Sequence, residues 1–279
     1  MPRPTTVQLQ ATAALVRQDI ITMLAAAGSG HPGGALGLAD IVTALYFSIM
    51  NIRPEQPSFE QRDIFLLSNG HCAPVQYAAM ARRGFFGLDE LTSLRQFGSR
   101  LQGHPERELL PGIETTSGPL GCGVSQAAGM AYALQYLEGN PERYMFVITG
   151  DGELNEGNIW EALLFANKYK LGRLIVIVDR NGIQIDGTTE QVMPLGDLKQ
   201  KWRSFGWHAE DIDGHNFDSI HHAIERAKAV THKPSVIIAH TVPGKGVDFM
   251  ERDYRWHGKA PNKEEATLAL EQLRLGGVR

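Results

Sequence analysis

The sequence lacks the features that mark secreted, membrane-spanning or nucleic-acid-binding proteins. It has two cysteines, Cys72 and Cys122, which are too few for a disulfide framework. No apolar run reaches the roughly 18 residues that a membrane span needs, and the N-terminal MPRPTTVQLQ has no apolar core of a signal peptide. The formal net charge of −4 leaves no basic surplus for nucleic acid. We therefore expect a cytoplasmic protein with no nucleic-acid or membrane partner.

Glycine, in contrast, is abundant. The chain has 30 glycines in 279 residues, well above the usual share of about 7%. They cluster where predicted strands give way to helices, which suggests that backbone approaches a ligand closely there.

Hydrophobic periodicity predicts an alternation of helices and strands. Predicted helices cover residues 6–27, 36–49, 73–83, 89–97, 124–137, 158–169, 197–205, 217–230 and 264–273, with a Gly- and Pro-rich loop at 99–121. Predicted strands cover residues 64–67, 144–149, 174–179, 207–212 and 236–240. Continuous apolar strands between helices indicate an α/β fold: a doubly wound, mostly parallel sheet with helices on both faces.

Ligands of such sheets bind at the carboxyl ends of the strands. This rule points to four loops: SNGH (68–71), GDGELNEG (150–157), RNGIQIDG (180–187) and TVPGKGV (241–247). The GKG within the last loop resembles a phosphate-binding turn, but that signal is weak and gives no assignment.

The stretch GDGELNEG combines features that conflict unless a cation is present. Gly150 and Gly152 allow a tight turn into a helix N-terminus, whose free N–H groups favour a phosphate. The repulsion between Asp151 and that phosphate would cost roughly 4 kcal/mol at 4 Å and an effective dielectric of about 20. The helix N-terminus stabilises a negative charge by only about 0.3–1 kcal/mol. A divalent ion between them resolves the conflict, and Mg²⁺ is the natural candidate.

The next strand offers further oxygen ligands. Asn181 lies 30 positions after Asp151 (181 − 151), and one helix and one strand fill that gap. Neighbouring parallel strands would place the two side by side, with the Ile183 carbonyl completing the protein's share of the metal ligands. The alternative is two ordinary turns, since GDG and NG are common turn sequences.

Four of the ten histidines lie in loops of small residues: His31, His71, His104 and His257. A histidine beside glycine can point into a cleft, and imidazole suits proton transfer on sugar hydroxyls near neutral pH. The alternatives are capping or surface histidines, or a zinc site, and the short paired spacing of zinc ligands is absent. We expect the other six histidines to be structural or solvated.

Together these stretches resemble transketolase. GDGELNEG, then WEA (160–162) and KLGRLIVIVDRNGIQIDG (170–187), resembles the thiamine diphosphate fingerprint, in which GDG is followed about thirty residues later by Asn. The resemblance continues in SGHPGGALG (29–37), SNGHCAP (68–74), GHPE (103–106), TTSGPLGCGVSQAAGMA (115–131) and the HG at 257–258. It covers nearly the whole chain and matches the first half of transketolase, the diphosphate-binding domain. We therefore expect residues 1–279 to form one thiamine diphosphate/Mg-binding domain.

The resemblance implies a role for each of these histidines. His71 and His257 lie near the cofactor diphosphate, and His257 also faces the substrate. His31 and His104 contact ketose hydroxyls and assist proton transfer.

The resemblance also implies cofactor contacts outside the histidines. Gly118 and Leu120 cover the aminopyrimidine side, and Gly152 donates its backbone N–H to the diphosphate. Glu156 corresponds to a carboxylate near the subunit interface. Cys122 stands where the family commonly has Gln, which leaves the local contacts of that loop open. Asp151, Asn181 and Ile183 would hold Mg²⁺, or Ca²⁺ or Mn²⁺ in its place.

A transketolase also has a pyrimidine-binding domain and a C-terminal domain, which the resemblance does not cover. The missing half supplies the glutamate that activates the cofactor and the groups that bind the sugar phosphate. We therefore expect the N-terminal subunit of a split transketolase that needs a C-terminal partner, most simply as α2β2, for ketol transfer between sugar phosphates.

Other functions remain open from the sequence. The chain would also suit the α subunit of a 2-oxo acid dehydrogenase, a synthase that joins pyruvate to an aldose phosphate, or a non-catalytic cofactor-binding module. The histidines favour transketolase over the dehydrogenase and argue against a non-catalytic module. A nucleotide-binding oxidoreductase is disfavoured because no GxGxxG follows a strand.

Overall fold

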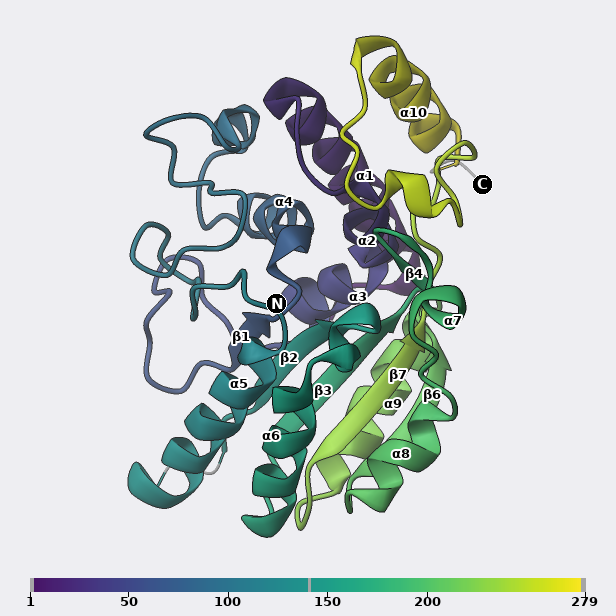
Figure 1. Ribbon diagram of the computed structural model, residues 1–279. Coiled ribbons are helices and arrows are strands. Elements are labelled where there is room, and N and C mark those ends of the chain that lie inside the picture. The colour runs from purple at the N-terminus through teal and green to yellow at the C-terminus, as the bar shows by residue number, and fades with distance from the viewer. Residues whose placement is uncertain (1–2, 140–141, 277–279) are drawn as a thin grey trace.

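Five parallel strands form the centre of the fold (Figure 1). The computed structural model describes residues 3–139 and 142–276. Residues 1–2, 140–141 and 277–279 of the predicted domain 1–279 lie outside the described residues. The sheet order is β1-β2-β3-β7-β6, and each neighbouring pair is parallel. The strands are β1 (Ile64–Leu67), β2 (Met145–Gly150), β3 (Leu174–Arg180), β6 (His208–Asp213) and β7 (Ser235–His240).

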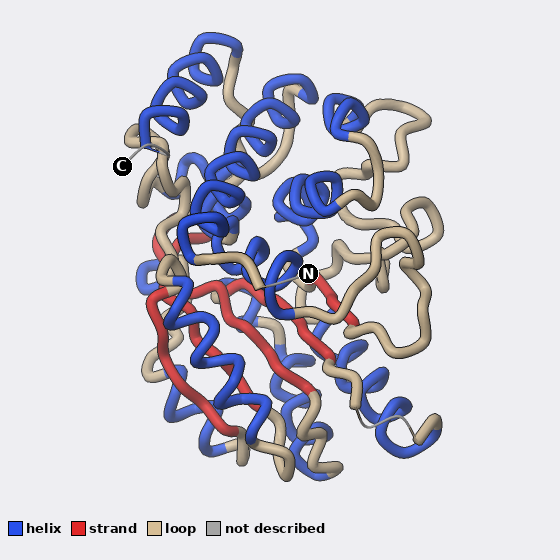
Figure 2. Tube along the Cα trace, turned by 180° about the vertical axis from the view of Figure 1, so that it is seen from behind, coloured by secondary structure: helices blue, strands red, loops and turns tan. Residues whose placement is uncertain are grey.

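Helices cover both faces of the sheet, as the sequence predicts. Figure 1 shows α5, α6 and α8 in front of the sheet and α9 behind it, and in Figure 2 the helix on the back face lies in front of the strands. The helices are α1 (Thr6–Ala27), α2 (Pro32–Gly37), α3 (Ala39–Ala44), α4 (Ala73–Arg83), α5 (Cys122–Tyr132), α6 (Gly157–Lys168), α7 (Thr189–Val192), α8 (Leu198–Ser204), α9 (Phe217–Ala229) and α10 (Lys263–Gly276).

Alternation along the strands builds two apolar cores. In β2, Phe146 and Ile148 pack into the core with α1, α3, α4 and α9, whereas Met145 and Val147 pack into the core with α5, α6 and α8. Successive side chains of a strand point to opposite faces, so a fully apolar strand supplies both cores at once. The continuous apolar strands therefore confirm the doubly wound α/β prediction.

Most predicted elements match within one or two residues, and the differences have local causes. The helix predicted at 36–49 begins earlier, because Pro32 is suited to the first turn of α2. It is then interrupted at Leu38 and ends as a π-helical turn, Leu45–Ile49. The helix predicted at 89–97 is a shorter 3₁₀ segment, Leu88–Ser93, and Arg95 beyond it has a left-handed φ of 61°.

A small hairpin follows β3 where the sequence predicts only a loop. Strands β4 (Ile183–Gln184) and β5 (Gly187–Thr188) pair antiparallel, and α7 begins at once, capped by Thr188. The hairpin fixes the RNGIQIDG loop against the carboxyl ends of the strands, and it supplies one side of the cavity described below.

Within residues 3–139 and 142–276, no helix is both long enough and apolar enough to cross a bilayer.

Candidate functional site

A cavity of about 180 Å³ opens at the carboxyl ends of the strands. Strands β2 and β3 are direct neighbours, and Gly150 pairs with Asp179 at their ends. The loops that follow these strands therefore meet, as predicted. The cavity is lined by seven of the ten predicted site residues: His71, Leu120, Asp151, Gly152, Asn181, Ile183 and His257.

Asp151 is the most deeply held of these residues. It directly follows β2 and is 1% exposed. Its Oδ1 accepts the N–H of Gly152 at 2.8 Å, and its Oδ2 accepts the N–H of Gly182 at 2.7 Å. Burial raises the pKa of this carboxyl, and the donors around it act in the opposite direction. The turn after β3 thus clamps the carboxylate from the neighbouring strand.

Arg180 is a cation at this carboxylate that the sequence does not predict. Its Nη1 lies 3.0 Å from Asp151 Oδ2 and donates to Thr189 Oγ1 at 2.8 Å, while its Nη2 donates to Glu190 at 2.9 Å. The available signal was its position: Arg180 is the last residue of β3 and lies between Asp179 and Asn181. Arg180 supplies positive charge beside the predicted metal ligand.

Asn181 is held by the buried Asp179. The amide Nδ2 of Asn181 donates to Asp179 Oδ2 at 2.8 Å, and its Oδ1 accepts the N–H of Ile183 at 3.0 Å. The Thr241 hydroxyl donates to the other Asp179 oxygen. Burial raises the pKa of Asp179 to about 7, and the nearby charge of Asp151 adds to the shift. Asp179 therefore orients the amide at the cavity floor.

Three histidines from distant loops form one cluster beside the cavity. The ring centroids of His31 and His71 are 5.1 Å apart, those of His71 and His257 are 5.2 Å apart, and those of His31 and His257 are 5.7 Å apart. Burial, with the neighbouring imidazoles, lowers the pKa of His31 to about 4 and that of His71 to about 3. Burial also lowers the pKa of His257. All three rings are therefore neutral at pH 7.

His104, Gly118, Glu156 and Cys122 do not line the cavity, and Leu120 lines it at its rim. His104 is close enough to lower the pKa of His31 and His71, and a Cβ on Gly118 would lie 3.9 Å from its ring. Gly118 has a φ of 148°, which suits glycine. Leu120 is 38% exposed at the rim. Glu156 is exposed at the N-cap of α6, and Cys122 accepts a hydrogen bond from Asn158 at 3.8 Å.

The structure adds lining residues that sequence reasoning missed. Asn69 precedes His71 in the SNGH loop, Glu153 follows the GDG turn, and Gln184 lies in β4. All three lie in loops that the sequence analysis had singled out, but no spacing rule distinguished them from ordinary turn residues.

The residues fit a diphosphate cofactor and a hard metal ion. Asn69 Oδ1, His31 Nδ1 and His257 Nδ1 are buried and find no hydrogen-bond partner among the described residues, so polar groups stand ready for a ligand. Within those residues no set of three His, Cys, Asp or Glu side chains could hold a metal. A metal would instead use Asp151, the Asn181 and Ile183 oxygens and phosphate oxygens, which is the donor set of Mg²⁺.

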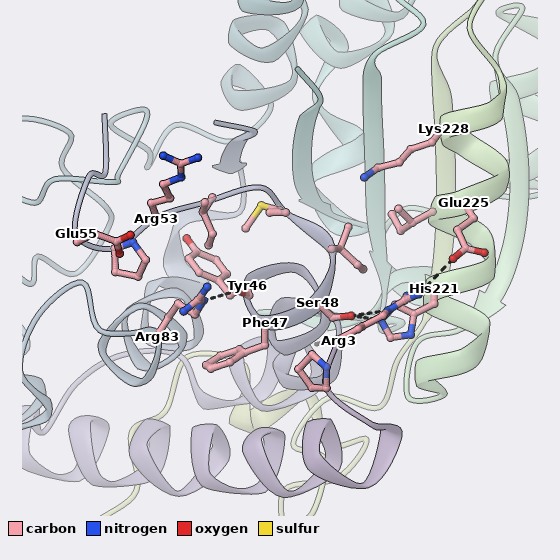
Figure 3. A pocket seen from close by; sticks show the side chains of 16 residues that line it. Arg3, Tyr46, Phe47, Ser48, Arg53, Glu55, Arg83, His221, Glu225 and Lys228 are labelled. Atoms are coloured by element: carbon pink, nitrogen blue, oxygen red, sulfur yellow. Dashed lines mark hydrogen bonds and ion pairs between the residues drawn. The ribbon is translucent and has the colours of Figure 1, made fainter. Parts of the chain in front are cut away.

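A second, larger hollow of about 680 Å³ lies at the other end of the strands (Figure 3). Arg3, His221 and Lys228 form one wall, and Arg53 and Arg83 lie across from them. The ammonium of Lys228 is 4.5 Å from the ring of Tyr144, which directly precedes β2. The hollow therefore adjoins the amino ends of the strands, and no predicted site residue lines it.

Comparison with known proteins matches the chain over most of its length. The model of the family "Transketolase, thiamine diphosphate binding domain" matches residues 9–276. A 6-deoxy-6-sulfo-D-fructose transketolase subunit from Clostridium sp. (strain MSTE9) is 41% identical over 98% of this chain and 98% of its own. An apulose-4-phosphate transketolase subunit from Phocaeicola vulgatus is 38% identical over 92% of this chain and 90% of its own.

A solved structure gives the same result. Transketolase from Leishmania mexicana superposes with a TM-score of 0.90 at 32% identity, covering 100% of this chain and 42% of that one. The chain thus spans less than half of that solved enzyme. The alignment over residues 9–276 and the shared fold show that the chain belongs to the family of transketolase thiamine diphosphate-binding domains.

Proposed function

We propose that this chain is the N-terminal subunit of a split transketolase. It would transfer a two-carbon ketol unit from a ketose phosphate to an aldose phosphate, as pentose phosphate reactions do, and would act only with a C-terminal partner. The observation that carries this proposal is the cluster of three neutral histidines beside the Asp151–Asn181 floor of one cavity. The names and lengths of the two relatives support it, because each is named as a subunit and the chain covers nearly all of it.

Different residues of the cavity would hold the metal, the diphosphate and the aminopyrimidine of the cofactor. Asp151, Asn181 and Ile183 would hold Mg²⁺ through oxygens, and the Gly152 N–H and His71 would contact the diphosphate. Gly118 and Leu120 would form the wall on the aminopyrimidine side. Thiamine diphosphate, when bound, supplies an electron sink for carbon–carbon bond cleavage.

The histidines would bind the sugar and move its protons. A neutral imidazole has one nitrogen that accepts a proton and one that donates. Nδ1 of His31 and of His257 is buried and has no partner in the described residues, and a substrate hydroxyl would satisfy these nitrogens. His104, beside them, would contact the same hydroxyls. The lowered pKa of His31 and of His257 keeps both rings neutral at pH 7, so each has one nitrogen that can accept a hydrogen bond from a substrate hydroxyl.

The cavity is smaller than a complete ligand pocket, as expected if a second subunit completes the site. Its 180 Å³ falls below the roughly 300–1,000 Å³ of ligand pockets, so a second wall would come from elsewhere. We propose that a C-terminal subunit supplies this wall together with the activating glutamate, in an α2β2 assembly. Residues 1–279 would then form a single domain. Both cysteines are free thiols, which fits a cytoplasmic location.

The experiment is to co-express the chain with a candidate C-terminal partner and to assay ketol transfer. With Mg²⁺, thiamine diphosphate, xylulose 5-phosphate and ribose 5-phosphate, we expect turnover by the complex and none by either chain alone. Oxidative decarboxylation of 2-oxo acids would instead support the dehydrogenase alternative, and condensation of pyruvate with an aldose phosphate would support the synthase. Turnover by the purified chain alone would refute the split enzyme.

A further inference from the structure

Glu153 is a buried carboxylate with an unusual set of partners. It lies in the 3₁₀ turn Gly152–Asn155 and is 3% exposed. Its Oε1 accepts the Ser68 hydroxyl and, at 2.6 Å, the N–H of Gly121. Its Oε2 accepts the Thr149 hydroxyl at 2.8 Å and the N–H of Gly150 at 3.1 Å. All four acceptor positions of an ionised carboxylate are therefore used.

These bonds join three segments that are distant in the sequence. Ser68 follows β1, Thr149 and Gly150 end β2 next to Asp151, and Gly121 precedes α5. Gly121 also ends the loop that carries Gly118 and Leu120. The other end of that loop is held by Ser117, whose hydroxyl donates to the Leu67 carbonyl at 2.7 Å. Glu153 is thus the second anchor of the wall between residues 117 and 121.

We propose that Glu153 is a positioning residue that fixes the Gly118–Gly121 wall of the cleft to the strand ends at Asp151. The wall is then in place before the cofactor binds. That thiamine diphosphate is the ligand rests on the proposed function, whereas the anchoring itself does not. Glu153 lines the cavity, but its carboxyl oxygens are engaged by these four donors, so it orders the site without taking part in the chemistry.

A carboxyl group can accept both backbone N–H groups at once, one on each oxygen, and an amide cannot. The hydroxyls of Ser68 and Thr149 can rotate and accept, but the N–H groups of Gly121 and Gly150 can only donate. The amide of Glu153→Gln places its NH₂ group against one of these N–H groups in either orientation. At least one backbone bond is then lost, and an unpaired buried donor loosens its segment.

The test measures hydrogen exchange by mass spectrometry in the full chain without cofactor. In Glu153→Gln we expect amide exchange of residues 115–124 to rise about tenfold or more, with α1 unchanged. Glu153→Asp keeps the carboxyl group but is one methylene shorter, and should raise exchange of the same segment. The matched control is Asp63→Asn, because Asp63 also accepts two backbone N–H groups, from Asn51 at 2.8 Å and Tyr144 at 2.9 Å, at the opposite end of the strands.

Kinetics of the complex with the partner provide the second measurement. We expect Glu153→Gln to raise the KM for thiamine diphosphate about tenfold while kcat at saturating cofactor stays within about twofold, and Asp63→Asn to change neither. Exchange of 115–124 equal to wild type, or raised equally by Asp63→Asn, would overturn the anchoring. If the exchange rises but the wild-type complex shows no dependence on thiamine diphosphate, the proposed function fails and the anchoring stands.

Discussion

The histidine cluster makes folding stability depend on pH in a way that one substitution isolates. The pKa of His71 falls from 6.5 to about 3 on folding, chiefly because of burial and then because of His257 and His31. Such a group has no pH-dependent effect above pH 6.5. Below it the unfolded chain binds a proton that the native chain does not, so stability falls as pH drops toward 3. At about pH 4.5 the loss reaches up to about 2.7 kcal/mol, from 1.36 kcal/mol per unit over two units.

The substitution that tests this is His71→Asn. At pH 7.5 we expect the variant to be less stable than wild type, because packing is lost. The difference between the two free energies of unfolding should then shrink by up to about 2.7 kcal/mol as pH falls to about 4.5. Asp179 has a raised pKa and acts in the opposite direction, but it is present in both proteins and cancels.

Urea unfolding followed by circular dichroism at several pH values measures this difference. The exposed His232 provides the control, because His232→Asn removes a histidine that lies outside the cluster. A His71→Asn difference that is constant within about 0.5 kcal/mol from pH 7.5 to 4.5 would refute the neutral imidazole of His71 in the native state.

Three further substitutions probe the site and its frame. Asp151→Asn should weaken Mg²⁺-dependent binding of thiamine diphosphate to the complex by at least about 100-fold, because the charge that holds the cation is lost; unchanged affinity by calorimetry would remove Asp151 from the metal site. His257→Ala should lower turnover by roughly 10²–10⁴-fold, and an unaffected rate would assign it a structural role. In Gly123→Ala a Cβ would lie 2.6 Å from the Cβ and 2.7 Å from the Cα of Ser68, so thermal unfolding should show a loss of about 1–3 kcal/mol; an unchanged Tm would contradict the close packing of α5 on β1.

The sheet was predictable because its residues carry two signals at once. LIVIVD is apolar throughout until its final Asp, and only a strand buried on both faces needs this pattern. The spacing from Asp151 to Asn181 then followed from one helix and one strand of ordinary length. The meeting of these two loops is confirmed by the pairing of Gly150 with Asp179.

The details of the site were less predictable because they depend on side-chain geometry across segments. The sequence places Arg180 next to Asn181, but only the fold shows its guanidinium at Asp151. Glu153 is one carboxylate among several in GDGELNEG, and its four donors come from three segments that only the fold brings together. The roles of His31, His104 and His257 in proton transfer stay predictions.

The central claim is that a metal ion and a diphosphate bind between Asp151 and Asn181. Its most direct test is a crystal of the chain with its C-terminal partner, thiamine diphosphate and Mn²⁺, recorded at the manganese absorption edge. We predict one anomalous peak in contact with oxygens of Asp151, Asn181 and Ile183 and of the diphosphate. Bound cofactor with the peak elsewhere, or with no peak, would contradict this claim.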